Sequence, residues 1–221
     1  INILSVDEIL YAPPPIASPE SILVNQTPKC CLWGACSACN SSVQKYPIIF
    51  LHGHAFNSGT SADYSLDAFN QIQEKLESEG YVSAGSSAVY VHSAGELSWA
   101  NVPKPITLKV SYYYDFMQES DKVSLVQTKS EPIDAYAIKL KEAIDWVQLK
   151  TAQPKVILVA HSMGGLVARR YVQIFGADNV DKMILIGTPN KGIVGNAASF
   201  CSIIGGELEC RDMQKVSLFL N

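Results

Sequence analysis

The sequence predicts an α/β fold built on an open, mainly parallel sheet with helices on both faces. Short apolar runs alternate along the chain with segments whose apolar residues recur at helical spacing. The resulting order is β-α-β-α-β, and strands that alternate with helices favour right-handed crossovers and parallel pairing. Hydrophobic residues make up 48% of the chain and charged residues 17%, which is the composition of a globular protein.

The first βα unit is expected between Pro47 and Gly80. Pro47–Leu51 is a short, continuous apolar run, as in a strand that a parallel sheet buries on both faces. A helix ending near Gly80 is indicated by four apolar residues at helical spacing: Leu66, Phe69, Ile72 and Leu76. Residues 81–105 are ambiguous, although Ala88–His92 is compatible with a strand. Ile106–Tyr114 is a better strand because it is rich in β-branched and aromatic residues.

The second half of the chain has the clearest alternation. A helix is predicted by an apolar stripe: Ile133, Ala137, Leu140, Ile144 and Val147. It is followed by an expected strand at Lys155–Ala160, a helix at Gly164–Phe175 and a strand at Lys182–Gly187. These three elements supply the second βαβ unit.

Composition divides the chain into three parts. Residues 1–45 are expected to be an irregular leader rich in proline and cysteine, with a possible strand at Ile1–Leu10 and an extended linker after it. Residues 46–195 form the predicted α/β core, and residues 196–221 begin a lid or cap segment. The sequence starts with Ile1 rather than methionine, which leaves open a signal peptide or anchor before it.

Charge and hydropathy exclude two classes of partner. The net charge of −4, from 17 basic and 21 acidic residues, provides no basic surface for nucleic acid and no basic block for anionic lipid. No apolar run approaches the roughly 18 residues of a membrane-spanning helix.

Six cysteines fall into two groups, four within residues 30–39 and the pair Cys201 and Cys210. The even count, with glycosylation sequons at Asn25 and Asn40 beside the first group, favours disulfides and an extracytoplasmic or secreted setting. Cys201 and Cys210 are the simplest pair, because their bond closes a short loop. The pairing within the first group stays open, and a zinc site is the alternative there: Cys30, Cys31, Cys36 and Cys39.

The segment "AHSMGG" carries the chemistry. In it Ser162 belongs to an A-x-S-x-G segment between a buried strand and a helix, which is the structural context that a nucleophile elbow requires. Such a turn needs small residues two positions before and after the serine, and Ala160 and Gly164 meet that need. The alternative is a serine that only caps the helix, which leaves the small neighbours and Gly165 unexplained.

Acyl transfer also needs two hydrogen-bond donors directed at the oxyanion. One is expected to be the backbone N–H of Met163, just after the nucleophile, at the positive end of the helix dipole. The other is expected in the loop "HGHAFN" after the first strand, most simply the backbone N–H of His54. His52 is interpreted as structural, and the side chain of His161 is expected to point away from the Ser162 hydroxyl.

Three segments, "PIIFLHGHAFN", "VILVAHSMGGLVARRYV" and "MILIGTPNKG", occur in the order and spacing of α/β-hydrolase lipases and esterases. Over about residues 46–221 the chain resembles this superfamily, in particular the microbial lipases with alanine at the first position of the elbow. The resemblance implies an α/β-hydrolase fold. It also implies that "RDMQKVSLFLN" lies in or next to a lid.

The sequence departs from that pattern after the elbow. The serine hydrolases of this fold have the chain order Ser, then Asp or Glu, then His, and no histidine follows His161 here. We expect the acid and the histidine in a C-terminal segment or a second chain that completes the fold. His92 is a weaker candidate for the base, and three acidic residues are expected to be surface charges rather than triad members: Asp134, Asp145 and Asp181.

The sequence therefore predicts serine-dependent hydrolysis of carboxylic esters, without metal or organic cofactor. Apolar residues in Ala197–Gly206 are compatible with a lid over an acyl chain, which favours lipid-like esters at a membrane surface, although packing in the core explains them equally well. The alternatives are a non-catalytic binding module that keeps the fold and an acyltransferase that uses an acceptor other than water.

Overall fold

The structure is a computed structural model that describes residues 29–32, 35–38, 45–54, 66–88, 104–119, 122–128, 130–195, 201 and 207–214. It separates into two units, Ile1–Lys45 and Tyr46–Asn221. The first unit contains an antiparallel hairpin, β1 (Lys29–Leu32) and β2 (Ala35–Ala38), in which Cys31 lies opposite Cys36 in the register. The expected strand at Ile1–Leu10, the possible strand residues 89–92 and most of the lid segment lie outside the described residues.

The second unit is built on a five-stranded sheet whose paired strands are all parallel. The strand order is β4-β5-β3-β8-β9. The strands are β3 (Ile48–Leu51), β4 (Val82–Ala88), β5 (Ile106–Ser111), β8 (Val156–His161) and β9 (Val180–Ile186). The central strand β3 is buried throughout, as its continuous apolar run predicts. The predicted α/β class is confirmed.

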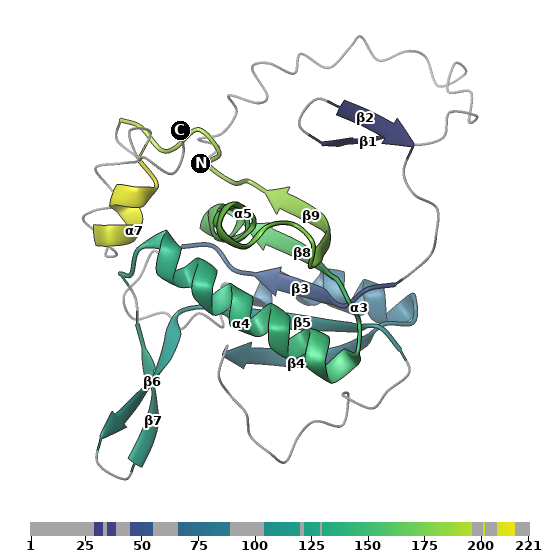
Figure 1. The fold of residues 1–221 in the computed structure, drawn as a ribbon, viewed down its shortest axis with the longest axis horizontal. Helices are drawn as coiled ribbons and strands as arrows, with labels where there is room; N and C mark the ends of the chain where they lie inside the picture. Colours follow the sequence, from purple (N-terminus) through teal and green to yellow (C-terminus); the bar gives the residue numbers. More distant parts are fainter. Residues whose placement is uncertain are drawn as a thin grey trace. The chain divides into compact units, whose positions relative to one another are not determined.

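Helices cover both faces of this sheet (Figure 1). α3 (Asn70–Ser78) lies on one face, and α4 (Ile133–Thr151) and α5 (Met163–Phe175) lie on the other. Successive residues of β3 serve the two faces in turn: Ile48 and Phe50 pack in the smaller core with Phe69, while Ile49 and Leu51 pack in the larger core. The predicted arrangement of helices is therefore confirmed.

Two details of the segment between β3 and β5 differ from the sequence-based expectation. In α3 the buried residue is Gln73, which donates to Thr107 Oγ1 at 2.9 Å, whereas Ile72 is 42% exposed. The strand in the ambiguous region is β4 (Val82–Ala88), which begins six residues before Ala88. This glycine- and serine-containing strand lacks an apolar run, and its pairing with β5 defines it.

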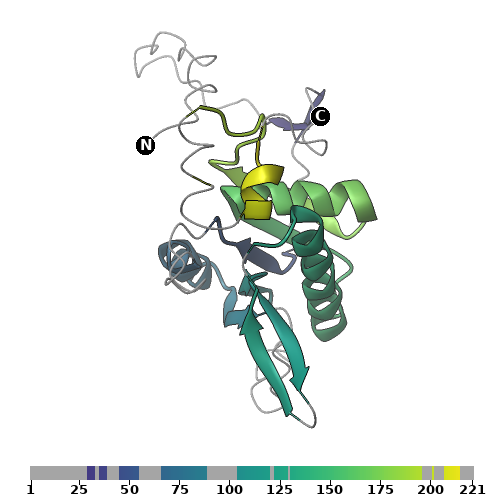
Figure 2. The same cartoon turned by 90° about the vertical axis from the view of Figure 1, so that its left-hand side faces the viewer.

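A hairpin that was not predicted from the sequence leaves the sheet between β5 and α4. It consists of β6 (Tyr114–Glu119) and β7 (Lys122–Gln127), paired antiparallel, and projects away from the sheet in Figure 2. The sequence predicts Tyr113 in the preceding strand, but its carbonyl oxygen accepts from Thr128 N and closes the base of the hairpin. Only Ser120 and Asp121 separate the two strands in the sequence, a spacing typical of tight hairpins that could have revealed it.

Candidate active site

Ser162 occupies the turn between β8 and α5 and has an unusual backbone conformation. Its φ is 52° and its ψ is −123°. Ala152, at the C-terminus of α4, has the same φ but a ψ of 25°, which is the ordinary left-handed conformation that ends helices. The ψ of Ser162 lies outside that region, where a residue with a Cβ is strained by about 1–3 kcal/mol.

This conformation excludes the simpler reading of Ser162 as a helix cap. A capping serine has extended backbone angles, and its hydroxyl accepts from an N–H in the first helical turn. Ser162 has a positive φ, and its side chain makes no capping hydrogen bond to α5. The side chain is left half-buried at the end of the sheet.

Close packing around the turn explains why the neighbouring residues are glycines. A Cβ added at Gly164 would lie 2.3 Å from the carbonyl oxygen of His52, and one added at Gly165 would lie 1.9 Å from Thr188 Oγ1. The small residue two positions after Ser162 is therefore required by contact with the end of β3, in addition to the strain of the turn itself. On the other side of the turn, Ser162 N donates to the carbonyl oxygen of Ile186 in β9 at 2.8 Å.

The loop after β3 lies directly against the turn. A Cβ added at Gly53 would lie 2.9 Å from Ser162 Cβ and 3.0 Å from His161 Nδ1, so only glycine allows this approach. Gly53, the residue before His54, is thereby packed against Ser162. Met163 is the first residue of α5, where helix N–H groups have no partner within the helix.

His52 is held by the sheet. Its ring is fully buried and stacks on Tyr112 with ring centroids 4.0 Å apart. Its Nδ1 lies 2.7 Å from the carbonyl oxygen of Gly53, and its Nε2 lies 3.2 Å from Ser111 Oγ. These contacts agree with the structural role that the sequence analysis gave to His52.

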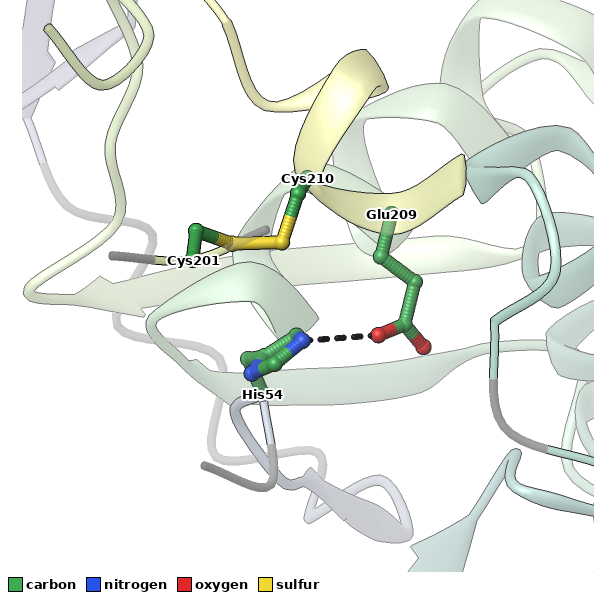
Figure 3. Close-up of a disulfide and its surroundings, with 4 residues drawn as sticks. All are labelled: His54, Cys201, Glu209 and Cys210. Carbon is green, nitrogen blue, oxygen red and sulfur yellow. Dashed lines mark ion pairs between the residues drawn. A yellow bond between two sulfur atoms is a disulfide. The ribbon is translucent and has the colours of Figure 1, made fainter. Parts of the chain in front are cut away.

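His54 makes a contact that the sequence analysis did not foresee. Its Nε2 lies 2.8 Å from Glu209 Oε2, and the two side chains are 3% and 2% exposed (Figure 3). Glu209 belongs to α7 (Glu207–Asp212), and its Oε1 accepts a hydrogen bond from Tyr136 of α4. No signal in the sequence pairs these residues, because Glu209 lies in a segment far along the chain.

The predicted disulfide between Cys201 and Cys210 is confirmed. It lies beside His54, and these three residues form the group of potential metal ligands among the described residues. Both sulfur atoms are committed to the disulfide, so they do not offer thiolates to a metal ion.

The remaining titratable candidates lie elsewhere. The three acidic residues form ion pairs with neighbouring basic side chains: Asp134 with Arg170, Asp145 with Lys141, and Asp181 with Lys182. They are surface charges, as predicted. His161 is exposed as a residue, although partial burial of its ring lowers its pKa below the usual 6.5, and His92 lies outside the described residues.

None of the helices that the structure describes is long and apolar enough to span a membrane.

A family model for the alpha/beta hydrolase fold matches residues 117–199 of this chain. No curated protein matches it. Among solved structures, the lin2722 gene product of Listeria innocua is 20% identical, over 69% of this chain and 55% of that chain, with a TM-score of 0.45. Two structures of phospholipase PlaB from Legionella pneumophila also match.

The phospholipase structure with thio-NAD is 15% identical, over 79% of this chain and 32% of that chain, with a TM-score of 0.44. The other phospholipase structure is 14% identical, over 79% of this chain and 34% of that chain, with a TM-score of 0.43. This chain thus spans 55% or less of the length of these three solved proteins. The family match covers β7, α4, β8, α5 and β9. Together with the parallel five-stranded sheet to which β8 and β9 belong, it identifies the chain as having the alpha/beta hydrolase fold.

Proposed function

We propose that the intact protein is a serine-dependent carboxylic ester hydrolase in which Ser162 is the nucleophile. The observation that carries this proposal is the strained backbone of Ser162, with φ of 52° and ψ of −123°, at a strand-to-helix turn. Strain of this kind persists where the surrounding structure enforces it, and it concentrates at functional sites. Three glycines allow the required packing here: Gly53, Gly164 and Gly165.

In this reaction Ser162 Oγ attacks the ester carbonyl carbon, and the carbonyl oxygen becomes negatively charged. The backbone N–H groups of Met163 and His54 are the proposed donors to that oxygen. The serine proton passes through a general base to the leaving alcohol, and water then cleaves the acyl-enzyme by the same route. No metal or organic cofactor takes part in these steps.

The general base is proposed to be a histidine that a C-terminal segment or a second chain supplies, together with its acidic partner. Two of the described histidines already have other contacts, His52 with Ser111 and His54 with Glu209. The coding sequence downstream of Asn221 tests this point directly, because a carboxylate followed by a histidine on loops after strands is expected there.

Lipid-like esters are the proposed substrates, on the basis of the apolar residues in the segment 197–206: Phe200, Ile203 and Ile204. An extracytoplasmic setting is proposed because the disulfide between Cys201 and Cys210 persists best under oxidising conditions. A series of p-nitrophenyl esters from acetate to laurate measures the preference. An increase in kcat/KM with acyl length supports a lipid-like substrate, and a maximum at acetate contradicts it.

The nucleophile is tested with a fluorophosphonate probe on the intact protein. Wild type is expected to be labelled at Ser162, and Ser162→Ala is expected to lose labelling and at least about 10³-fold in kcat. Ser78→Ala is the matched control, because the Ser78 hydroxyl is exposed at the end of α3, where it donates to the carbonyl oxygen of Lys75.

A folded wild-type protein that is not labelled contradicts the proposal and favours a non-catalytic binding module. Product analysis in water with an added alcohol separates hydrolysis from acyl transfer. If ester formation exceeds acid formation at low alcohol concentration, the protein is a transferase rather than a hydrolase.

A further inference from the structure

We propose that Glu209 is a positioning residue of this site: it holds the side chain of His54 and thereby sets the position of the His54 backbone N–H. This inference rests on the proposed function, in which that N–H donates to the oxyanion. Glu209 itself is not proposed to touch the substrate. Its effect passes through a side chain that belongs to the loop after β3.

The contact between the two side chains is close and excluded from solvent. Glu209 Oε2 lies 2.8 Å from His54 Nε2, and Glu209 as a residue is 1% exposed. A carboxylate removed from water is stable only where charged or hydrogen-bonding groups surround it. Figure 3 shows the imidazole of His54 and the carboxylate of Glu209 facing each other next to the disulfide. The pair is therefore a built contact rather than a surface encounter.

Glu209 is itself fixed by α4. The Tyr136 hydroxyl donates to Glu209 Oε1, and burial, followed by the negative charge of Glu209, raises the pKa of Tyr136 above its usual 10.0. Tyr136 therefore stays protonated and remains a donor. A second contact joins the same two helices, because Asp212 Oδ2 accepts from Ile133 N at 3.0 Å. The disulfide from Cys210 to Cys201 ties the helix again, at the residue after Glu209.

The position of His54 matters because its loop packs tightly on the nucleophile turn. Gly53 approaches Ser162 so closely that a Cβ on Gly53 would lie 2.9 Å from Ser162 Cβ. Stabilisation of an oxyanion depends on donors about 2.7–3.1 Å from the oxygen, so a small displacement of the loop weakens it. A positioning contact acts on the transition state more than on substrate binding, and its loss lowers kcat rather than raising KM.

The experiment compares two substitutions on α7 in the intact protein, Glu209→Gln and Asp212→Asn. Both remove a charge and keep the side-chain size, and each faces α4, but only Glu209 contacts His54. With a p-nitrophenyl ester as substrate, Glu209→Gln is expected to lower kcat by about 10-fold or more with KM within about twofold. Asp212→Asn is expected to leave kcat within about twofold of wild type.

A second variant, His54→Gln, keeps the test decisive if Glu209→Gln folds poorly, and the double variant measures the coupling if both fold. His54→Gln removes the imidazole and keeps the backbone N–H, so it is expected to lower kcat by a similar factor. The double variant His54→Gln with Glu209→Gln is expected to lose no more than the larger single loss, because both substitutions break one contact. Circular dichroism and thermal unfolding show which variants retain the fold.

Three results overturn the inference while the proposed function stands: an unchanged kcat in folded Glu209→Gln or in folded His54→Gln, an equal loss in Asp212→Asn, or losses in His54→Gln and Glu209→Gln that multiply in the double variant. Each of these results would mean that Glu209 stabilises the packing of α7 and does not position His54. A wild-type protein that a fluorophosphonate does not label overturns both the inference and the proposed function, so the two failures are distinguishable.

Discussion

At the scale of single residues, the candidate site depends on glycines at positions where a Cβ would collide with neighbouring atoms. Gly165 faces Thr188, whose Oγ1, Cγ2 and Cβ would lie 1.9, 2.7 and 2.8 Å from a Cβ at that position. Rotation of the Thr188 side chain cannot relieve all three contacts, because its own Cβ does not move with χ1. Gly165 therefore lets the first turn of α5 pack on the residues that follow β9.

We predict that Gly165→Ala destabilises the protein by about 1–3 kcal/mol, the usual effect of overpacking a dense interior. Urea denaturation measures this change. Thr188→Ala is the matched partner variant: it removes two of the three contacting atoms and a buried hydroxyl that has no hydrogen-bond partner among the described residues. Part of the loss is expected to return in the double variant, and additive losses would contradict the packing explanation.

At the scale of elements, α7 is held in place by groups outside itself. A helix of six residues is too short to be stable alone. Its outside partners include Cys201, which forms the disulfide with Cys210, and α4, which donates hydrogen bonds to the Glu209 and Asp212 carboxylates. Asp212 also stabilises the N-terminus of α4. Pro132 precedes that helix and offers no capping side chain, and the Asp212 carboxylate places a negative charge and an acceptor at its N-terminus.

We predict that replacing both Cys201 and Cys210 by alanine lowers the stability of this segment by about 2–3 kcal/mol, as expected for removal of a cross-link that closes a short loop. Hydrogen exchange of the amides in residues 207–214 measures it. Faster exchange there, with unchanged exchange in β8 and β3, is the expected pattern. If exchange in α7 does not change, its contacts with α4 are sufficient and the disulfide is not required to hold it.

At the scale of the whole second unit, two cores lie on opposite faces of one sheet, and the larger one contains a cluster of buried tyrosines. Tyr112 packs on Tyr113 and Tyr136 with ring centroids 5.2 and 4.8 Å apart. The Tyr112 hydroxyl donates to the carbonyl oxygen of His52 at 2.7 Å. The cluster is therefore bonded to the residue that follows β3.

Alkaline pH is expected to destabilise the fold through these tyrosines. Burial raises the pKa of Tyr112 and of Tyr136 above the usual 10.0, so the folded protein retains both protons where the unfolded chain releases them. Stability is then fully present below pH 10 and falls as pH rises above it, by up to about 1.4 kcal/mol per pH unit for each tyrosine.

Urea unfolding between pH 8 and 11.5 measures this slope. Tyr136→Phe and Tyr112→Phe are each expected to make it shallower, because phenylalanine has no proton to release. The slope is compared separately from stability at pH 8, which both variants lower by removing a hydrogen bond. Equal slopes in wild type and both variants would contradict the prediction.

Local patterns in the amino-acid sequence were enough to predict the alternation of strands and helices in the second unit, the places of α4 and β8 in the chain, and the strand–serine–helix segment at Ser162. These features depend on residues close in sequence. Hydrophobic periodicity indicates which side of an element is buried, and small residues on both sides of a serine indicate a turn with little space for side chains. The disulfide between Cys201 and Cys210 was accessible for the same reason, because the two residues are close in sequence.

Features that depend on residues far apart in the chain became apparent only from the folded structure. β4 has no apolar run and exists through its pairing with β5, and Gln73 rather than Ile72 is buried because Thr107 of β5 binds it. The contact between His54 and Glu209 likewise joins distant segments. Hydrophobic periodicity indicates which face of an element is buried but not which element packs on that face. A polar side chain is buried without a large cost only where the folded chain places a hydrogen-bonding partner against it.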